Sequence, residues 1–386
     1  MTKPSFIRGA EKGSFAEYTL TQRLPYILKK VLADNPNYGT VVKERINRLL
    51  INFPYKTISP PATSGPFPNA DIWECYLQQW NGATWLEVPF IEAEGYFYWL
   101  LLAETDYFSI PTDPFAIQKR KSEPMALAKL LPYVSRLNQE ITQLYRSECL
   151  VRWLYGSLWG NSADLSQSPG WRENLALTPP PLLVDDTPQL CSLLAHPRQR
   201  MDWILDNVGE ELFADLCVCD YLLSTDQLAS VHLHFKPYPV FVSDATLDDW
   251  KAALTALTDY DALTRIFAQR LQKHQEQGRI TVTTHGFWGT TLALQKLPSL
   301  LQESFMASSL LVLKGDLNYR RWLEDRHWAY DTPLAQVEPT LPIPVLALRT
   351  LKSEMVVGLD AEILDRVSRE TDWLTSGKYG LIQGTL

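Results

Sequence analysis

The spacing of apolar residues predicts helices through the first part of the chain. Positions 15–32 carry apolar residues three and four apart, and Pro25 is expected to interrupt or kink this helix. The same spacing predicts further helical stretches at 41–53, 70–80, 88–104 and 125–158. A stretch rich in Ser and Pro follows at 166–187, and it is expected to be a linking loop.

From Met201 onward, short apolar runs alternate with amphipathic stretches. Trp203-Ile-Leu205 is typical of a buried strand, and a helical pattern begins at Glu210 after the flexible Gly209. Further strands are predicted at 230–235, 239–242, 280–284, 310–313 and 345–348, and helices at 247–257, 262–277 and 292–306. Strands and helices that alternate at these lengths form a largely parallel sheet with both faces covered.

The predicted fold class is therefore α/β, with a helical N-terminal region packed on a Rossmann-like α/β/α sandwich. We divide the chain into a helical region at 1–165, a linking segment at 166–200 and an α/β/α domain at 201–386.

Composition and charge narrow the class of protein. The chain has 386 residues and a formal net charge of -8, and its only basic run, Lys119-Arg-Lys121, is short, so nucleic-acid binding is not expected. No apolar run approaches membrane-spanning length, and no signal segment opens the chain. The five cysteines are odd in number and scattered, which favours reduced thiols. We expect a cytoplasmic protein without membrane contact, and the sequence indicates no obligate protein partner.

Polar side chains follow four of the predicted strands. They are Asp206-Asn207, Asp244, Lys314 to Asp316, and Arg349 with Lys352. Parallel strands place their carboxyl ends at one edge of the sheet, so these groups are expected to converge there. Carboxylate and amide oxygens select hard or borderline divalent ions such as Mg²⁺ or Mn²⁺, and the cations would complement an anion such as phosphate.

Other roles for these residues stay open at this point. Asp206 or Asn207 could cap the helix that begins at Glu210, and Asp244 could cap the helix after Thr246. Asp316 could cap a turn, and Arg349 could pair with a nearby acid. The sequence contains no Gly-x-Ser-x-Gly elbow, no Gly-x-Gly-x-x-Gly and no P-loop, which argues against those nucleophile and nucleotide sites.

The chain resembles a known family along nearly its whole length. The family is that of the metal-dependent damage-control phosphatases, in its acidic-residue-methyltransferase-like (protein-glutamate O-methyltransferase-like) branch. The motifs are Gly13-Ser-Phe-Ala16, Arg23-Leu-Pro25, Ala93-Glu-Gly-Tyr96, Leu158-Trp-Gly-Asn161, Asp164-Leu-Ser166, Leu205-Asp-Asn-Val-Gly209, Phe241-Val-Ser-Asp244, Lys314-Gly-Asp-Leu-Asn-Tyr-Arg320, Asp325-Arg326, Trp328, Arg349-Thr-Leu-Lys352 and Ser376-Gly-Lys-Tyr-Gly380. The Arg349-Thr-Leu-Lys352 stretch is similar to the Arg-Thr-x-Lys signature of the branch.

The resemblance implies a site and an activity. It implies one divalent ion (Mn²⁺, Co²⁺, Ni²⁺ or Mg²⁺) on Asp206, Asn207 and Asp244, with Lys352 as a further catalytic group. It implies that a phosphorylated sugar, of the fructose 1-phosphate or fructose 6-phosphate type, is hydrolysed. The substrate contacts implied are Asp206, Asn207, Asp316, Leu317, Asn318, Tyr319, Arg320 and Lys352. Whether Asp206 attacks directly or only holds the metal stays open.

Two rival functions remain at this point. The branch has also been credited with S-adenosylmethionine-dependent methylation of protein glutamate, in which Glu211 and Asp244 would lie near the methyl donor. The second rival is a non-catalytic sugar-phosphate binder. Three departures from the family pattern bear on specificity more than on chemistry: Gly95 in place of a Cys, Trp99-Leu100 in place of an Arg pair, and Glu210 in place of an aromatic residue.

Overall fold

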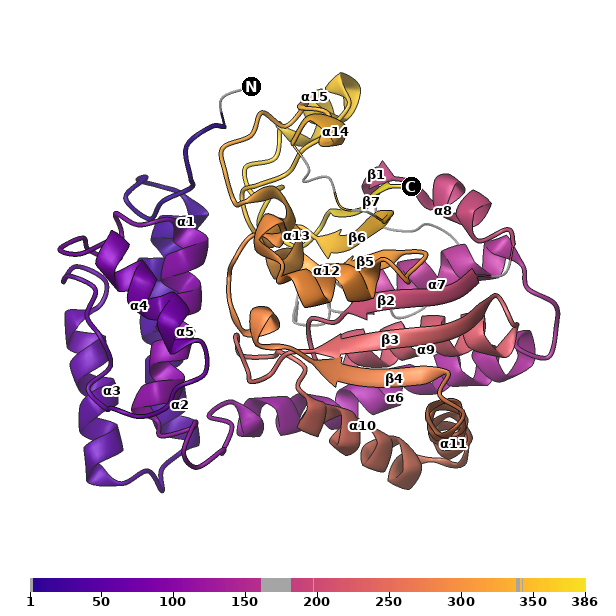
Figure 1. Cartoon of the computed structure of the whole chain (residues 1–386), viewed down its shortest axis with the longest axis horizontal. Helices are drawn as coiled ribbons and strands as arrows, with labels where there is room; N and C mark the ends of the chain where they lie inside the picture. The colour runs from indigo at the N-terminus through magenta and orange to yellow at the C-terminus, as the bar shows by residue number, and fades with distance from the viewer. Residues whose placement is uncertain (1–2, 161–181, 197, 338–340, 342) are drawn as a thin grey trace.

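The computed structural model describes residues 3–160, 182–196, 198–337, 341 and 343–386. A helical N-terminal region, α1 to α5, stands beside an α/β body (Figure 1). Its elements are α1 (Phe15–Tyr18), a π-helical turn (Thr19–Arg23), α2 (Leu24–Asp34), α3 (Thr40–Asn52), α4 (Ala70–Gln79) and α5 (Phe90–Glu104). Pro25 lies in the first turn of α2, directly after the π-helical turn, so the α-helical pattern changes next to this proline while the helical path continues.

The body is built on a seven-stranded sheet in the order β1-β7-β6-β5-β2-β3-β4. The strands are β1 (Leu182–Asp185), β2 (Arg198–Ile204), β3 (Leu228–Phe235), β4 (Ile280–Thr284), β5 (Leu311–Lys314), β6 (Val345–Thr350) and β7 (Gly380–Thr385). Five neighbours, β6-β5-β2-β3-β4, are parallel. Only β7 pairs antiparallel with β6, and β1 runs parallel to β7 at the edge. The predicted largely parallel α/β sheet is confirmed.

Helices cover both faces of this sheet (Figure 1). The helices of the body are α6 (Ala116–Glu140), α7 (Ser147–Trp159), α8 (Thr187–Leu193), α9 (Glu210–Ser224), α10 (Leu247–Tyr260), α11 (Ala262–Glu276), α12 (Ser299–Phe305), α13 (Gly315–Leu323), α14 (Leu334–Val337) and α15 (Ala361–Val367), of which α14 and α15 lie away from the sheet. Side chains alternate across the strands: Leu311 and Leu313 join the core shared with α1 to α5, whereas Val312 joins the core beneath α6, α7 and α9. Within the described residues, no helix combines the length and the apolarity needed to cross a bilayer.

Several predicted elements differ from the structure, mostly at prolines. Residues 239–242 form a loop and not a strand, because Pro237 and Pro239 lack the N–H groups that a ladder needs. The helix predicted at 292–306 is divided by Pro298 into a 3-10 turn (Leu294–Lys296) and α12. The long helix predicted at 125–158 is two helices, α6 and α7, separated at 141–146.

The predicted linking segment also contains regular structure. Leu182–Asp185 forms strand β1, where the Pro-rich composition predicted a loop, and β7 at the end of the chain was not predicted at all. Asn161, the motif 164–166 and the Pro run 179–181 lie outside the described residues. The three-part division of the chain stays a prediction, although α6 and α7, which it places in the helical region, pack against α9 of the body.

A buried arginine ties the helical region to the body. Arg320 of α13 binds both oxygens of Asp325, each at 2.9 Å, and donates to Glu94 of α5 at 2.8 Å. Its guanidinium lies 4.6 Å from the ring centre of Phe90. Only 3% of the Arg320 side chain is exposed, so both carboxylates depend on it for their charge compensation.

Replacement of this arginine should therefore destabilise the protein. We expect Arg320→Met to lower the free energy of unfolding by about 3–5 kcal/mol, because Glu94 and Asp325 would be left buried without their cation. Arg369→Met is the matched control, since Arg369 and its partner Asp365 are 74% and 72% exposed. Urea unfolding followed by circular dichroism measures both. A loss for Arg320→Met no larger than that of the control would contradict this account.

Candidate active site

The candidate site lies where the connections of the parallel sheet reverse direction. From β2 the chain continues to β3 on one side, whereas from β5 it continues to β6 on the other. β2 and β5 are neighbours, so the loop at 205–209 lies next to the junction of β5 and α13 at 314–316. This topological switch point is where open α/β sheets bind ligands.

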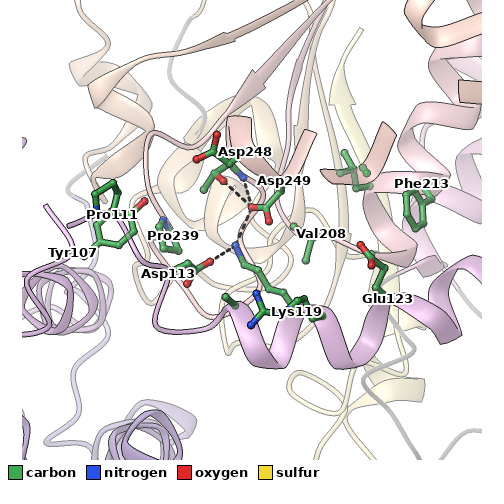
Figure 2. Close-up of a pocket in the computed structure, with 16 residues that line it drawn as sticks. Tyr107, Pro111, Asp113, Lys119, Glu123, Val208, Phe213, Pro239, Asp248 and Asp249 are labelled. Atoms are coloured by element: carbon green, nitrogen blue, oxygen red, sulfur yellow. Dashed lines mark hydrogen bonds and ion pairs between the residues drawn. The ribbon is translucent and has the colours of Figure 1, made fainter. Parts of the chain in front are cut away.

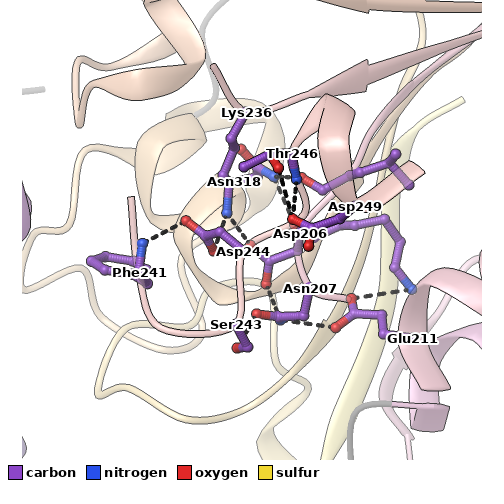
Figure 3. A network of polar contacts seen from close by, with 12 residues as sticks. Asp206, Asn207, Glu211, Lys236, Phe241, Ser243, Asp244, Thr246, Asp249 and Asn318 are labelled. Atoms are coloured by element: carbon purple, nitrogen blue, oxygen red, sulfur yellow. Dashed lines mark hydrogen bonds and ion pairs between the residues drawn. The ribbon is translucent and has the colours of Figure 1, made fainter. Parts of the chain in front are cut away.

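Two aspartates share a buried lysine at this point. Lys236 follows β3, and its Nζ lies 2.8 Å from Asp206 Oδ1 and 2.6 Å from Asp244 Oδ1 (Figure 3). Lys236 is 2% exposed and Asp244 0% exposed. Burial raises the pKa of the Asp244 carboxyl, against the pull of Lys236. Burial also opposes the charge of Lys236, but the two aspartates outweigh it and raise the pKa of the ammonium.

Asn207 has its side-chain amide fixed on both ends. Its Nδ2 donates to Asp206 Oδ2 at 2.7 Å and to Glu211 Oε2 at 2.9 Å. Its Oδ1 accepts a hydrogen bond from the Ser243 hydroxyl at 2.6 Å. Both residues are labelled in Figure 3. An isolated β-bridge pairs Asn207 with Asp244, so the loop after β3 folds back on the loop after β2. Asp244 therefore reaches the cluster through this loop and not through a strand end of its own.

A second buried lysine, Lys314, pairs with the acidic residues of α9 next to the cluster. Lys314 Nζ, at the end of β5, lies 2.9 Å from Asp215 and 3.6 Å from Glu211. It also donates to the hydroxyl and carbonyl oxygens of Ser157 in α7. Burial raises the pKa of Glu211 to about 7, with Lys314 opposing the shift. Glu211 thus needs further positive charge nearby to stay ionised at neutral pH.

The charges of this cluster fit a divalent ion. Among the described residues, the cations that pair with Asp206, Asp244, Glu211 and Asp215 are Lys236 and Lys314, so the group has a formal charge of −2 when all four carboxylates are ionised. Among the described residues, no three His, Cys, Asp or Glu side chains are grouped as a ready metal site. The oxygen donors that could hold an ion are instead the two aspartates with the amide oxygen of Asn207, a set suited to Mg²⁺ or Mn²⁺.

Gly315 allows β5 and α13 to approach Asp206. Its φ is +79°, and a Cβ built on it would lie 1.9 Å from Asp206 Oδ2. No side chain can occupy that position while Asp206 keeps its place. The first turn of α13 therefore starts directly against the aspartate, with amide groups that have no acceptor within the helix.

Asp316 and Arg349 form the next part of the site. Arg349 Nε donates to Asp316 Oδ1 at 2.8 Å, and the Ser353 hydroxyl donates to the same oxygen at 2.9 Å. Burial acts against ionisation of Asp316, but Arg349 and Arg320 outweigh it and lower its pKa. The open possibility that Arg349 pairs with a nearby acid is thus confirmed, and the acid is Asp316.

The rest of the predicted substrate segment is largely buried. Leu317 is 2% exposed and packs in the core, and the hydroxyl of Tyr319 donates to Gln383 at 2.7 Å. Asn318 Nδ2 donates to the Lys314 carbonyl at 2.8 Å. These residues can contact a ligand mainly through their backbone groups, because their side chains already have partners inside the protein.

Lys352 is the available cation near these groups. It lies two residues past the end of β6, beside Ser353, and is partly exposed. Among the described residues, its ammonium has no hydrogen bond or ion pair. Its role in substrate binding stays a prediction.

The structure decides between the helix-cap alternatives. Gly209 is the N-cap of α9, so neither Asp206 nor Asn207 caps that helix. Thr246 caps α10 in a capping box with Asp249, so Asp244 is not the cap there. Sequence reasoning missed Lys236 and gave Ser243 no role of its own, although Ser243 lies in the Phe241-Val-Ser-Asp244 motif.

A separate cavity of about 180 Å³ lies on the other side of the loop after β2. Val208 and Gly209 line it together with Lys119 of α6 (Figure 2). Lys119 Nζ lies 2.9 Å from both Asp113 and Asp249, and it donates to the carbonyl oxygen of Asp244 at 2.7 Å. Lys119 thus holds α6 against the loop that carries Asp244.

Comparison with known proteins identifies the family. A family model described as the damage-control phosphatase ARMT1-like domain matches residues 19–367. The chain belongs to this family. It is 32% identical to the damage-control phosphatase ARMT1 of Danio rerio, over 99% of this chain and 97% of that protein. It is 28% identical to the human protein of the same name, over 98% of both chains.

Structural comparison shows the shared fold. The crystal structure of a DUF89 family protein from Pyrococcus horikoshii matches with a TM-score of 0.51 at 15% identity, covering 91% of this chain and 94% of that one. Membership in the ARMT1-like damage-control family makes this chain a phosphatase of a metal-dependent kind, which confirms the predicted family and enzyme class. The substrate, the metal and the roles of individual residues stay predictions.

The departures from the ARMT1-like pattern have structural partners. A Cβ at Gly95 would lie 2.3 Å from Thr291 Cγ2, so the glycine matches the close approach of the 286–292 loop. Trp99 donates to the Pro68 carbonyl, and Glu210 pairs with Lys129 at 2.6 Å. Among the described residues, neither Trp99 nor Glu210 has a hydrogen bond or ion pair with Asp206, Asp244 or Lys236.

The contact between Gly315 and Asp206 gives a sharp test of the site. We expect Gly315→Ala to lower phosphatase activity about 100-fold, because a displacement of Asp206 by about 1 Å misplaces the reacting groups. Gly278→Ala is the matched control: its φ is +70°, but no atom lies within 4 Å of the added Cβ. It should keep its activity and lose only about 1 kcal/mol of stability. Phosphate release and thermal unfolding measure the two effects, and equal activity losses would contradict the assigned contact.

Proposed function

We propose that this phosphatase hydrolyses sugar phosphates of the fructose 1-phosphate or fructose 6-phosphate type in metabolite damage control, with one divalent ion. The observation that carries this proposal is the cluster of Asp206, Asn207 and Asp244 at the topological switch point, with its excess negative charge. The resemblance of the motifs to the damage-control branch supports the substrate class. Mn²⁺, Co²⁺, Ni²⁺ and Mg²⁺ are the candidate ions.

The metal would be held by Asp206, Asn207 and Asp244. Asp206 already receives Lys236 on one oxygen and Asn207 on the other, which favours the role of a fixed ligand over that of an attacking nucleophile. Ser243 and Glu211 fix the orientation of the Asn207 amide. A bound divalent ion supplies charge stabilisation for the phosphoryl group and makes water a better nucleophile.

The substrate would lie between this cluster and the loop after β6. The free amides at the start of α13, against Asp206, suit the oxygens of a phosphate group. Lys352 brings a cation for the charge that develops in the transition state. Asp316, held in place by Arg349 and Ser353, would offer its second oxygen to the sugar hydroxyls, and that oxygen lies 3.7 Å from Arg320 Nη1.

The same experiments also test the two rival functions. Glu211, the residue predicted to lie near S-adenosylmethionine, is bound to Asn207 and faces Lys314, an arrangement that supports a role in the metal cluster. Methyl transfer to protein glutamate without phosphate release would favour the methyltransferase. Tight binding of a sugar phosphate without turnover would favour the binder.

Removal of a metal ligand should abolish metal-dependent turnover. We expect Asp244→Asn to lower phosphate release from a panel of sugar phosphates at least about 100-fold, because a metal contributes several kcal/mol of transition-state stabilisation. The protein is stripped with EDTA, and Mg²⁺, Mn²⁺, Co²⁺ or Ni²⁺ is added back.

Asp248→Asn is the control for Asp244→Asn, since Asp248 is 92% exposed and lies only four residues away. It should release phosphate at the wild-type rate. Folded wild-type protein that releases no phosphate with any of the four metals would refute the proposed function. Full activity in Asp244→Asn would refute the ligand assignment alone.

Lys352 should act on the substrate and not on the metal. We expect Lys352→Met to lower kcat/KM for the best sugar phosphate about 100-fold, as loss of a transition-state donor does, while Mn²⁺ affinity is unchanged. Lys251→Met, at a 77% exposed lysine, is the control. Steady-state kinetics and calorimetric Mn²⁺ titration separate the two effects. An unchanged kcat/KM would remove Lys352 from the site.

A further inference from the structure

Lys236 is the least expected residue of the candidate site. It follows the last residue of β3, and an isolated bridge to Thr246 holds its backbone. Its side chain is 2% exposed, and its two acceptors are the carboxylates assigned to the metal. Burying an ammonium group this deeply removes it from water, and the free energy that this costs must be compensated by its ion-pair partners.

The geometry shows what the ammonium does. Its contacts are to Oδ1 of both aspartates, whereas Oδ2 of Asp206 receives Asn207 and Oδ2 of Asp244 receives the backbone N–H of Phe241 at 2.6 Å. No other cation among the described residues joins Asp206 directly to Asp244. Without Lys236, two buried carboxylates would face each other across the space that it fills, and they would repel.

We propose that Lys236 is a built-in counter-cation of the metal site, a positioning residue that holds Asp206 and Asp244 together when no metal is present and limits how tightly the metal is held. This inference rests on the metal site proposed above. Because the ammonium stays within contact of two ligands, it removes one unit of negative charge from the cluster and repels an incoming divalent ion. Reversible, moderate metal affinity follows from that repulsion.

Two effects of opposite sign follow for a neutral replacement. Lys236→Met should make the metal-free protein less stable, because the carboxylates lose their cation. It should also bind Mn²⁺ more tightly, because the cluster then carries one more negative charge. A variant that merely damaged the structure would weaken metal binding instead, so the sign of the affinity change identifies the role.

The experiment is a titration of the EDTA-stripped full chain with Mn²⁺ alone, followed by calorimetry, with thermal unfolding recorded at zero and saturating Mn²⁺. We expect Lys236→Met to lower the Kd for Mn²⁺ at least about tenfold, as removal of a unit charge a few ångströms away predicts. Its melting temperature without metal should be below that of wild type. Saturating Mn²⁺ should raise its melting temperature by more than it raises that of wild type. Lys236→Gln, which keeps hydrogen-bond donors, should shift the Kd in the same direction and serves if the Met variant does not fold.

Two further variants make the comparison specific. Lys236→Arg keeps the charge and should bind Mn²⁺ within about threefold of wild type, since the Coulomb repulsion is preserved. Lys119→Met removes another buried, ion-paired lysine, but Lys119 contacts Asp244 only through its carbonyl oxygen. It should lower stability without tightening Mn²⁺ binding.

The outcomes separate this inference from the proposed function. Wild-type protein that binds no Mn²⁺ would overturn the metal site, and the inference with it. Wild-type binding together with an unchanged or weaker affinity in folded Lys236→Met or Lys236→Gln would overturn the role of Lys236 alone. An equal gain in Lys119→Met would show that the effect is general and not specific to Lys236, and it would also overturn the inference.

Discussion

The structure depends on keeping several carboxylates ionised where water is excluded. Asp206, Asp244, Glu211 and Asp215 meet at the switch point, and burial raises the pKa of Asp244, Glu211 and Asp215. An isolated buried carboxylate would take up a proton, so each must have a cation or a donor within contact. Lys236 and Lys314 provide the cations, one between the aspartates and one next to Glu211 and Asp215, and the divalent ion proposed above would balance the negative charge that is left.

Residues from distant parts of the chain contact the charged cluster and the segments next to it. Lys314 donates to the carbonyl oxygen of Ser157 in α7, and Lys119 of α6 donates to the carbonyl oxygen of Asp244. Glu94 of α5 accepts a hydrogen bond from Arg320. The helices before residue 160 are thus more than a cover for the sheet. Their packing fixes the positions of the loops that carry the site, and this explains why the family pattern extends over nearly the whole chain.

The sequence allowed much of this to be predicted, and the exceptions have physical causes. Buried strands such as 203–205 and 310–313 show in apolar runs, and the polar residues after them, Asp206 and Asp316, could be placed at one edge because parallel strands require it. Asp244 was placed there for a partly wrong reason, since the stretch before it is a proline-containing loop that folds back onto Asn207. β7 escaped prediction because Gly380 and Gly384 interrupt its apolar pattern. Lys236 carried no signal, since a lysine after a strand is most often a solvated side chain and its two partners are 30 and 8 residues away.

The charged cluster around Lys236 and the three departures from the family pattern belong to separate sets of contacts. The aspartates, the amide and both lysines form one closed set of contacts, in which a change at any member alters the charge felt by the others. Gly95, Trp99 and Glu210 lie outside that set and have partners of their own. Substitution at those positions would leave the hydrogen bonds and ion pairs of the cluster in place. The cluster tolerates far less, because a Cβ at position 315 would collide with Asp206 and because Lys236 contacts both carboxylates at once.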